Sequence, residues 1–163
     1  MLVPGLTGSK LRSRRTGETV WGSGIGLLFP RDGGYGFARP ISNSISDPAS
    51  NRKRLEAYAV LETIRLGPFR RGIYGPLLRS LEARGYRRGR LDPPSAGVER
   101  RIDPGASLYT FAYDWRESAV WAAAELAEAL EELRRARGAE RLQVDLICQS
   151  SGGYVCRWLA KYG

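Results

Sequence analysis

One short stretch of the sequence carries residues that could bond covalently to a substrate. It reads Cys148-Gln-Ser-Ser-Gly-Gly153 and follows an apolar run that begins at Leu142. A serine on a sharp turn between a buried strand and a helix is a nucleophile elbow, where small neighbours permit strained backbone angles. Ser150 is favoured over Ser151 as the nucleophile, because it leaves both glycines on the tight side of the turn. The chemistry would be attack of a serine oxygen on an ester carbonyl.

The base that such a serine needs is missing from the sequence. The chain contains no histidine, the residue that usually takes the proton of the serine. The usual elbow reads Gly-x-Ser-x-Gly, and Cys148 stands in place of its first glycine. A strand-to-helix turn without a catalytic role is the alternative interpretation. In proteins with this elbow the acid and the histidine follow the serine. Since Ser150 lies only 13 residues from the end, we expect an N-terminal portion of a longer protein.

The first residues of the chain suit the other half of such a site. A very short apolar strand at the start leads directly into Gly5-Leu-Thr-Gly8. A loop in this place could donate one backbone N–H to the oxyanion that forms during acyl transfer, and Ser151 could donate the second. A plain tight turn is the alternative for the loop.

The elements that would position these residues follow from the spacing of apolar side chains. Helices are predicted from Ile73 to Gly85, from Glu117 to Arg137 and from Gly152 to Tyr162. Strands are predicted at Ser107–Tyr113 and Leu142–Ile147. This order predicts a parallel βαβ unit and an α/β fold. The apolar face of the second helix would hold Val120, Ala123, Ala127, Leu130 and Leu133.

The region before the first helix has a different composition. From Trp21 to Pro48 the sequence is rich in Gly, Pro, Ser and Asn, with aromatic residues scattered through it. A long irregular segment inside a compact domain is usually functional. We therefore expect residues 20–70 to form a cap or lid over the substrate, within a single domain that covers residues 1–163.

Charge and cysteine content narrow the classes of partner. Residues 1–101 hold 19 Lys and Arg against 8 Asp and Glu, a net charge of +11. This basic half could attract an anionic membrane surface. Nucleic-acid binding is disfavoured because no aromatic-rich basic motif accompanies the arginines. The chain has no 18-residue apolar run and no signal peptide, so the sequence assigns no compartment.

Cys148 and Cys156 are expected to be two buried thiols rather than a disulfide.

Four segments in this order resemble the lecithin:cholesterol acyltransferase family, which includes lysosomal phospholipases and phospholipid:diacylglycerol acyltransferases. The third, Tyr-Asp-Trp-Arg at a strand end, is the most specific. The matching segments are Val3-Pro-Gly-Leu-Thr-Gly-Ser-Lys-Leu11, Tyr74-Gly-Pro-Leu-Leu-Arg-Ser-Leu-Glu-Ala-Arg-Gly-Tyr86, Phe111-Ala-Tyr-Asp-Trp-Arg116 and Val144-Asp-Leu-Ile-Cys-Gln-Ser-Ser-Gly-Gly153.

This resemblance implies the N-terminal portion of an α/β-hydrolase fold, cut after the nucleophile elbow. Ser150 would be the nucleophile of a lipid acyltransferase or lipase, with the amides of Leu6 and Ser151 as the oxyanion hole. Asp114, Trp115 and Arg116 would line or brace the site. The substrate would be a phospholipid or acylglycerol, and no metal or cofactor is implied.

Two alternatives accompany this interpretation. The family usually has Gly-His-Ser-Met-Gly-Gly at the elbow, where this chain has Cys148-Gln-Ser-Ser-Gly-Gly. Without its base the chain alone would be inactive, and it could instead be a non-catalytic module that binds lipid or a membrane. The three residues of the Asp-Trp-Arg segment could equally be a structural ion pair and a core tryptophan.

Overall fold

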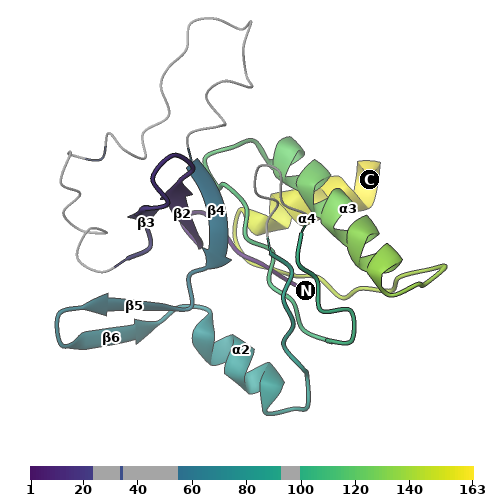
Figure 1. The fold of residues 1–163 in the computed structure, drawn as a ribbon, viewed down its shortest axis with the longest axis horizontal. Helices are drawn as coiled ribbons and strands as arrows, with labels where there is room; N and C mark the ends of the chain where they lie inside the picture. The colour runs from purple at the N-terminus through teal and green to yellow at the C-terminus, as the bar shows by residue number, and fades with distance from the viewer. Residues whose placement is uncertain (24–33, 35–54, 93–99) are drawn as a thin grey trace, which may run out of the picture.

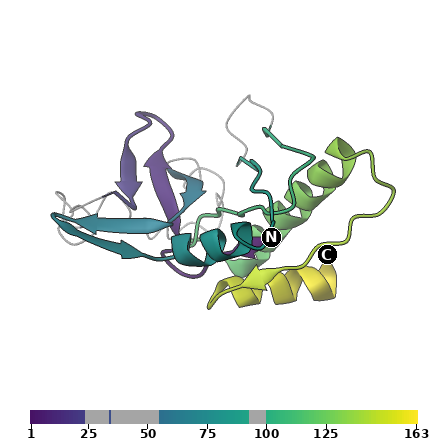
Figure 2. The same cartoon turned by 90° about the horizontal axis from the view of Figure 1, so that it is seen from below.

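The computed structural model describes residues 1–23, 34, 55–92 and 100–163. Figure 1 shows two groups of elements on either side of β1 (Leu2–Val3): an antiparallel sheet and a pair of helices. In Figure 2 the same two groups are seen at opposite ends of the molecule, with α2 between them. No helix in the described ranges is long and apolar enough to cross a membrane.

The parallel part of the fold is centred on β1. On one side β1 pairs in parallel with β7 (Ile147–Cys148). On the other side Leu2 forms a parallel bridge with Thr110 and donates a hydrogen bond to the carbonyl oxygen of Tyr109, at 2.9 Å. β1 therefore lies between two segments, Ser107–Tyr113 and Leu142–Ile147. The sequence predicts these as the strands before and after the longest helix.

Both of these predicted strands are shorter than expected. The prediction of a buried strand over Leu142–Ile147 is wrong, because ladder pairing covers only Ile147 and Cys148 and Ile147 is exposed. The segment Ser107–Tyr113 is extended but forms only isolated bridges. A segment is a strand only where a neighbouring strand forms ladder hydrogen bonds with it. β1 has only two residues, so it can pair with only a short part of either segment.

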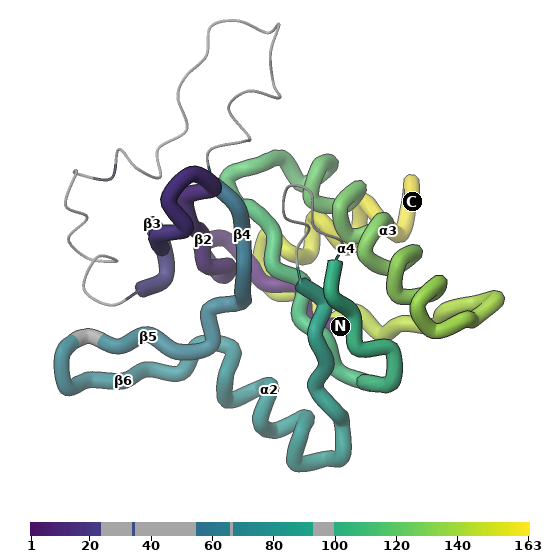
Figure 3. Tube along the Cα trace, viewed as in Figure 1, coloured from purple at the N-terminus to yellow at the C-terminus, as the bar shows by residue number. Residues whose placement is uncertain are grey.

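Five further strands were not predicted from the sequence. β2 (Ser9–Ser13) lies between β3 (Thr19–Trp21) and β4 (Leu55–Val60) in an antiparallel sheet, and β5 (Thr63–Leu66) pairs with β6 (Phe69–Gly72) in a hairpin. The tube in Figure 3 shows this hairpin extending away from the rest of the chain.

Part of the expected cap belongs to the core. The predicted cap spans residues 20–70, of which 24–33 and 35–54 lie outside the described residues. Within the described part, Leu55, Ala57 and Val60 of β4 are buried. The signal for β4 is the alternation of its apolar residues, which is typical of a half-buried strand.

The helices agree more closely with the sequence. α4 spans Gly152–Tyr162, the predicted range, while α2 (Gly75–Glu82) and α3 (Ala119–Ala136) lie within theirs. α3 begins where the Ser118 hydroxyl accepts a hydrogen bond from a backbone N–H, and it ends before Gly138, whose φ is +60°.

The predicted face of α3 is partly wrong. Ala123 and Leu133 are buried as expected, but Val120 is 43% exposed. The helix instead buries Leu126 and Ala129. Many positions of this helix are alanines, so two adjacent faces are both apolar enough to be buried. The face that contains Leu126 is the buried one, because a leucine side chain gains more from burial than an alanine.

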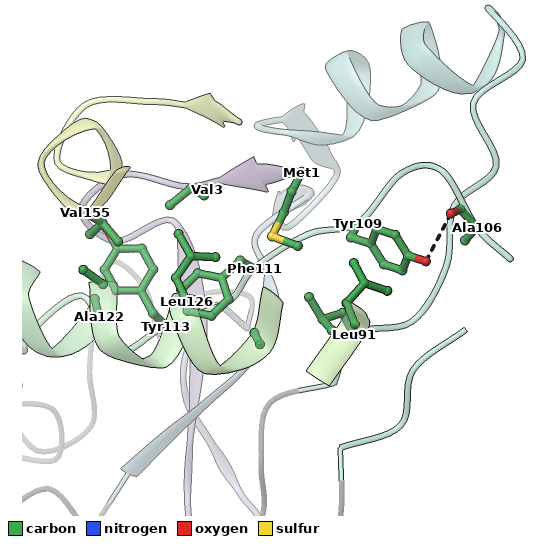
Figure 4. Close-up of a cluster of buried hydrophobic side chains, with 13 residues drawn as sticks. Met1, Val3, Leu91, Ala106, Tyr109, Phe111, Tyr113, Ala122, Leu126 and Val155 are labelled. Carbon is green, nitrogen blue, oxygen red and sulfur yellow. Dashed lines mark hydrogen bonds between the residues drawn. The ribbon is translucent and has the colours of Figure 1, made fainter. Parts of the chain in front are cut away.

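One cluster of buried side chains holds β1, α3 and α4 together. Figure 4 shows Val3 of β1 among side chains from the 109–113 segment, α3 and α4. Val155 of α4 lies beside Tyr113 and Ala122 in this cluster. Burial of these side chains fixes the start of α4 against the end of β1, which is where the candidate site lies.

Candidate functional site

Ser150 has the backbone of a nucleophile elbow. It lies between β7 and α4 with φ at +52°, in the left-handed region that costs a residue with a side chain about 1–3 kcal/mol. Its side chain is exposed. A strained, exposed serine between a strand and a helix is the geometry that the sequence predicts for this position.

Gly152 allows the helix to begin close to β1. A Cβ atom at this position would lie 2.5 Å from the Pro4 carbonyl oxygen and 2.7 Å from that of Val3. Both neighbours are backbone atoms and cannot move aside without shifting the strand. The second glycine, Gly153, has no such neighbour within 4 Å. The sharp turn therefore requires glycine at position 152 and not at position 153.

The loop after β1 lies against the elbow. A Cβ atom added to Gly5 would lie 2.8 Å from the Cβ of Ser150 and 2.3 Å from Oε1 of Gln149. The turn is closed by a hydrogen bond of 3.0 Å from the Gly8 N–H to the Gly5 carbonyl oxygen. The predicted loop and the predicted nucleophile are thus in contact, and only glycine fits between them.

The two predicted oxyanion donors have no acceptor among the residues that the structure describes. Within the described residues, neither the N–H of Leu6 nor that of Ser151 donates a hydrogen bond. Leu6 lies at an exposed corner of its turn, and Ser151 occupies the N-cap of α4. Amides in these places can donate to an added oxyanion without losing an internal bond.

Two tyrosines that the sequence analysis missed connect the loop to the elbow. The Tyr74 hydroxyl accepts a hydrogen bond from the Gly5 N–H at 2.9 Å and donates one to Oε1 of Gln149 at 2.7 Å. The Tyr113 hydroxyl lies 3.0 Å from the Pro4 carbonyl oxygen and 3.4 Å from Oγ of Ser151. No local pattern marks these roles, because each partner is more than 35 residues away.

Tyr113 is a hydrogen-bond donor here and not a base. Burial raises the pKa of its phenol above the ordinary value, with the hydrogen bond to Ser151 acting in the opposite direction. An ordinary tyrosine is already protonated at neutral pH. The raised pKa therefore keeps the hydroxyl neutral, so that it can donate to the Pro4 carbonyl oxygen but cannot remove a proton from serine.

The prediction of two free thiols is wrong. Cys148 and Cys156 form a disulfide, with Cα atoms 6.6 Å apart and a sequence separation of 8. The left-handed turn at Ser150 folds the second turn of α4 back over the end of β7, which brings the two positions together. The covalent link spans the elbow, with the serine inside its loop.

Trp115 contacts the sheet of β2 and β3, and its neighbours Asp114 and Arg116 contact each other. Asp114 and Arg116 form a two-point ion pair, with Nη2 to Oδ2 at 2.5 Å and Nε to Oδ1 at 2.8 Å. The Trp115 indole donates to the carbonyl oxygen of Ser9 at 3.1 Å and packs edge-on against Trp21. A role for the three residues in lining or bracing the site stays a prediction.

Two cavities among the described residues do not have Ser150 in their lining. The larger, of about 410 Å³, lies at the other end of β1 and β7, between Met1, Tyr86 and Leu133. A smaller one of about 100 Å³ is lined by Tyr113 and Asp114, among others. No group of three or more His, Cys, Asp or Glu side chains in the described ranges is placed to hold a metal ion.

Comparison with known proteins gives no match: no protein-family model, no curated protein and no solved structure matches this chain.

Proposed function

We propose that Ser150 is the nucleophile of an acyl-transfer enzyme of the serine-hydrolase type, acting on the acyl ester of a lipid. The observation that carries the proposal is the left-handed backbone of this serine at a strand-to-helix turn. Strain of this kind persists only where surrounding contacts enforce it, and it is common at active sites.

The contacts around the serine support the same proposal. Gly5 and Gly152 leave room for the loop and the helix to approach the serine, so that donors from two elements can act on one oxygen. The amides of Leu6 and Ser151 have no protein acceptor among the described residues. Each donor of an oxyanion hole contributes about 3–4 kcal/mol to transition-state stabilisation in serine hydrolases.

The reaction follows from these parts. The Ser150 oxygen attacks the ester carbonyl, the carbonyl electron pair moves onto oxygen, and the amides of Leu6 and Ser151 hold that charge. Collapse of the intermediate breaks the ester C–O bond, and the leaving alcohol takes the proton that the serine gave up. An alcohol or water then accepts the acyl group from the serine.

No side chain beside Ser150 in the described part of the structure is identified as its proton acceptor. The sequence has no histidine, and burial raises the pKa of the neighbouring Tyr113. A histidine on further chain, or a base added in solution, would fill this role. The proposal therefore predicts a nucleophile that is positioned but slow until a base is present.

A fluorophosphonate that carries an alkyl chain tests the proposal, because it phosphonylates serines held beside an oxyanion hole. The protein is incubated with the probe, with and without imidazole as the external base, and the adduct is located by peptide mass mapping. We expect a single adduct on Ser150, formed faster with imidazole.

The matched controls are two neighbouring serine variants. Ser150→Ala should abolish the adduct, whereas Ser151→Ala keeps its backbone N–H and should still be labelled. Labelling that is spread over several serines, or that survives in Ser150→Ala, would contradict the proposal.

A further inference from the structure

The hairpin of β5 and β6 exposes a basic and apolar surface that no other described element covers. All four residues of β6 are exposed. Phe69 follows the turn at the far end of the hairpin and is 77% exposed, the largest value among the exposed large apolar side chains of the described residues. A two-stranded hairpin without a third strand gains little stability from burial.

Three arginines lie directly behind this tip. Arg65, Arg70 and Arg71 are exposed, and within the described residues none of them forms an ion pair. Arg88 is by contrast paired with Glu62 and Glu82, at 2.7 Å and 2.9 Å. The hairpin is therefore a local concentration of uncompensated positive charge.

The strand register makes this charge unfavourable for the hairpin alone. Arg65 and Arg70 are directly opposite each other in the antiparallel ladder, so their side chains share one face. Like charges in this position destabilise a strand pair. Arg71 is opposite Ile64 on the other face, which also carries Phe69. Anions bound at the tip would relieve the repulsion.

We propose that the β5–β6 hairpin is a membrane-docking element that inserts Phe69 into a bilayer containing anionic phospholipid. The phenyl ring would enter the boundary between headgroups and acyl chains. Arg65, Arg70 and Arg71 lie one or two residues from the tip, at the depth of the lipid phosphates. Long arginine side chains can keep their charge in the headgroup layer while the apolar tip is buried.

The shape of the molecule suits this arrangement. The hairpin extends beyond the body of the protein with its turn outermost, so the tip can enter a membrane without unfolding of other elements (Figures 1 and 2). The contact uses no residue of the Ser150 site. It therefore does not depend on the function proposed for that serine.

The test is flotation of the protein with vesicles of phosphatidylcholine, with and without phosphatidylserine. The charge variant is Arg65→Gln/Arg70→Gln/Arg71→Gln. Its matched control is Arg101→Gln/Arg141→Gln/Arg157→Gln, which changes the net charge by the same amount at exposed arginines elsewhere. We expect binding to vesicles with phosphatidylserine, a loss of about tenfold or more in the hairpin variant, and little loss in the control.

A second pair of variants tests the apolar tip. Phe69→Ala should weaken binding by about tenfold. Tyr154→Ala, at an aromatic residue that is 70% exposed on α4, should not. Ser150→Ala should float like the wild type, which separates this proposal from the function of the serine.

Several results would overturn the docking proposal. They are the absence of binding to phosphatidylserine vesicles, equal binding to vesicles without that lipid, or equal losses in the two charge variants. A further one is hairpin-dependent binding of a DNA duplex that does not require Phe69, which would assign the arginines to nucleic acid instead.

Discussion

The elbow around Ser150 and the β5–β6 hairpin differ in how the rest of the molecule constrains them. The elbow is held by a disulfide, by close backbone approaches at Gly5 and Gly152 and by a hydrogen bond from Tyr74. The hairpin carries exposed side chains on β6 and an unfavourable arginine pair. The contacts around the elbow enforce a strained backbone at Ser150, whereas the hairpin leaves the charges of its arginines uncompensated.

This difference separates two ways in which a chain can prepare a function. A reacting atom must be held in place before substrate arrives, so contacts accumulate around it and tolerate local strain. A docking surface needs accessible groups whose favourable partners arrive later. We therefore expect substitutions of the glycine and cysteine residues that hold the elbow to act mainly on stability, and those in the hairpin to act mainly on binding.

The largest effect is expected at Gly152. Gly152→Ala places a Cβ within 2.7 Å of two backbone oxygens, and we expect a loss of about 3 kcal/mol in the free energy of unfolding. Gly153→Ala, with no atom within 4 Å, should leave stability unchanged or raise it by up to about 1 kcal/mol. Urea unfolding of both variants measures the difference. Equal stabilities would show that the helix does not start as close to β1 as described.

Removal of the disulfide is the next largest effect. The bridge joins cysteines with a sequence separation of 8. The entropy of closing such a loop predicts that Cys148→Ala/Cys156→Ala loses about 2.5 kcal/mol in the free energy of unfolding. The amides of residues 149–152 should also exchange faster with deuterium. Reduced wild type should resemble the variant, and the variant should not respond to dithiothreitol. A wild type whose unfolding is unaffected by complete reduction would contradict the bracing role of the bridge.

A substitution at the proposed nucleophile should stabilise the protein. Ser150→Gly removes the cost of a left-handed residue with a Cβ, so we expect a gain of about 1 kcal/mol. Ser150→Ala retains the Cβ and should unfold like the wild type. Thermal unfolding of the three proteins checks the order. A loss of stability in the glycine variant would mean that the left-handed turn at φ +52° carries little strain.

The smallest effect is expected in the hairpin. Arg70→Glu converts the repulsion with Arg65 into an attraction, and we expect about 0.5 kcal/mol of added hairpin stability. Arg71→Glu faces Ile64 and should give no such gain. Amide exchange of residues 63–72 measures both. Equal protection in the two variants would argue against the register described for the hairpin.

The elements around Ser150 could be predicted because their signals are local. The range of α4 and the sharp turn before it follow from apolar spacing and from small residues at fixed offsets. The Cys148–Cys156 disulfide could not be predicted in this way. Its formation depends on how far the turn folds the helix back, which sequence separation does not reveal.

The unpredicted strands have a similar cause. β2 and β4 pair across more than 40 residues, so the neighbour of each is not evident locally. β5 and β6 are only four residues each and pair across a short turn, so their pattern is too brief to mark them as strands. The predicted strand before Ser150 is shorter in the structure because its partner, β1, has two residues. The family resemblance, the α/β-hydrolase fold class and the roles of Leu6 and Asp114 stay predictions.

The central claim is that Ser150 accepts an acyl group. The most direct measurement is to mix the protein with an activated acyl ester and imidazole, quench in acid at short times, and map the acylated peptide by mass spectrometry. The account predicts one acyl group, on Ser150, absent from Ser150→Ala and retained in Ser151→Ala. Acylation spread over lysines and other serines, or none at Ser150, would contradict it.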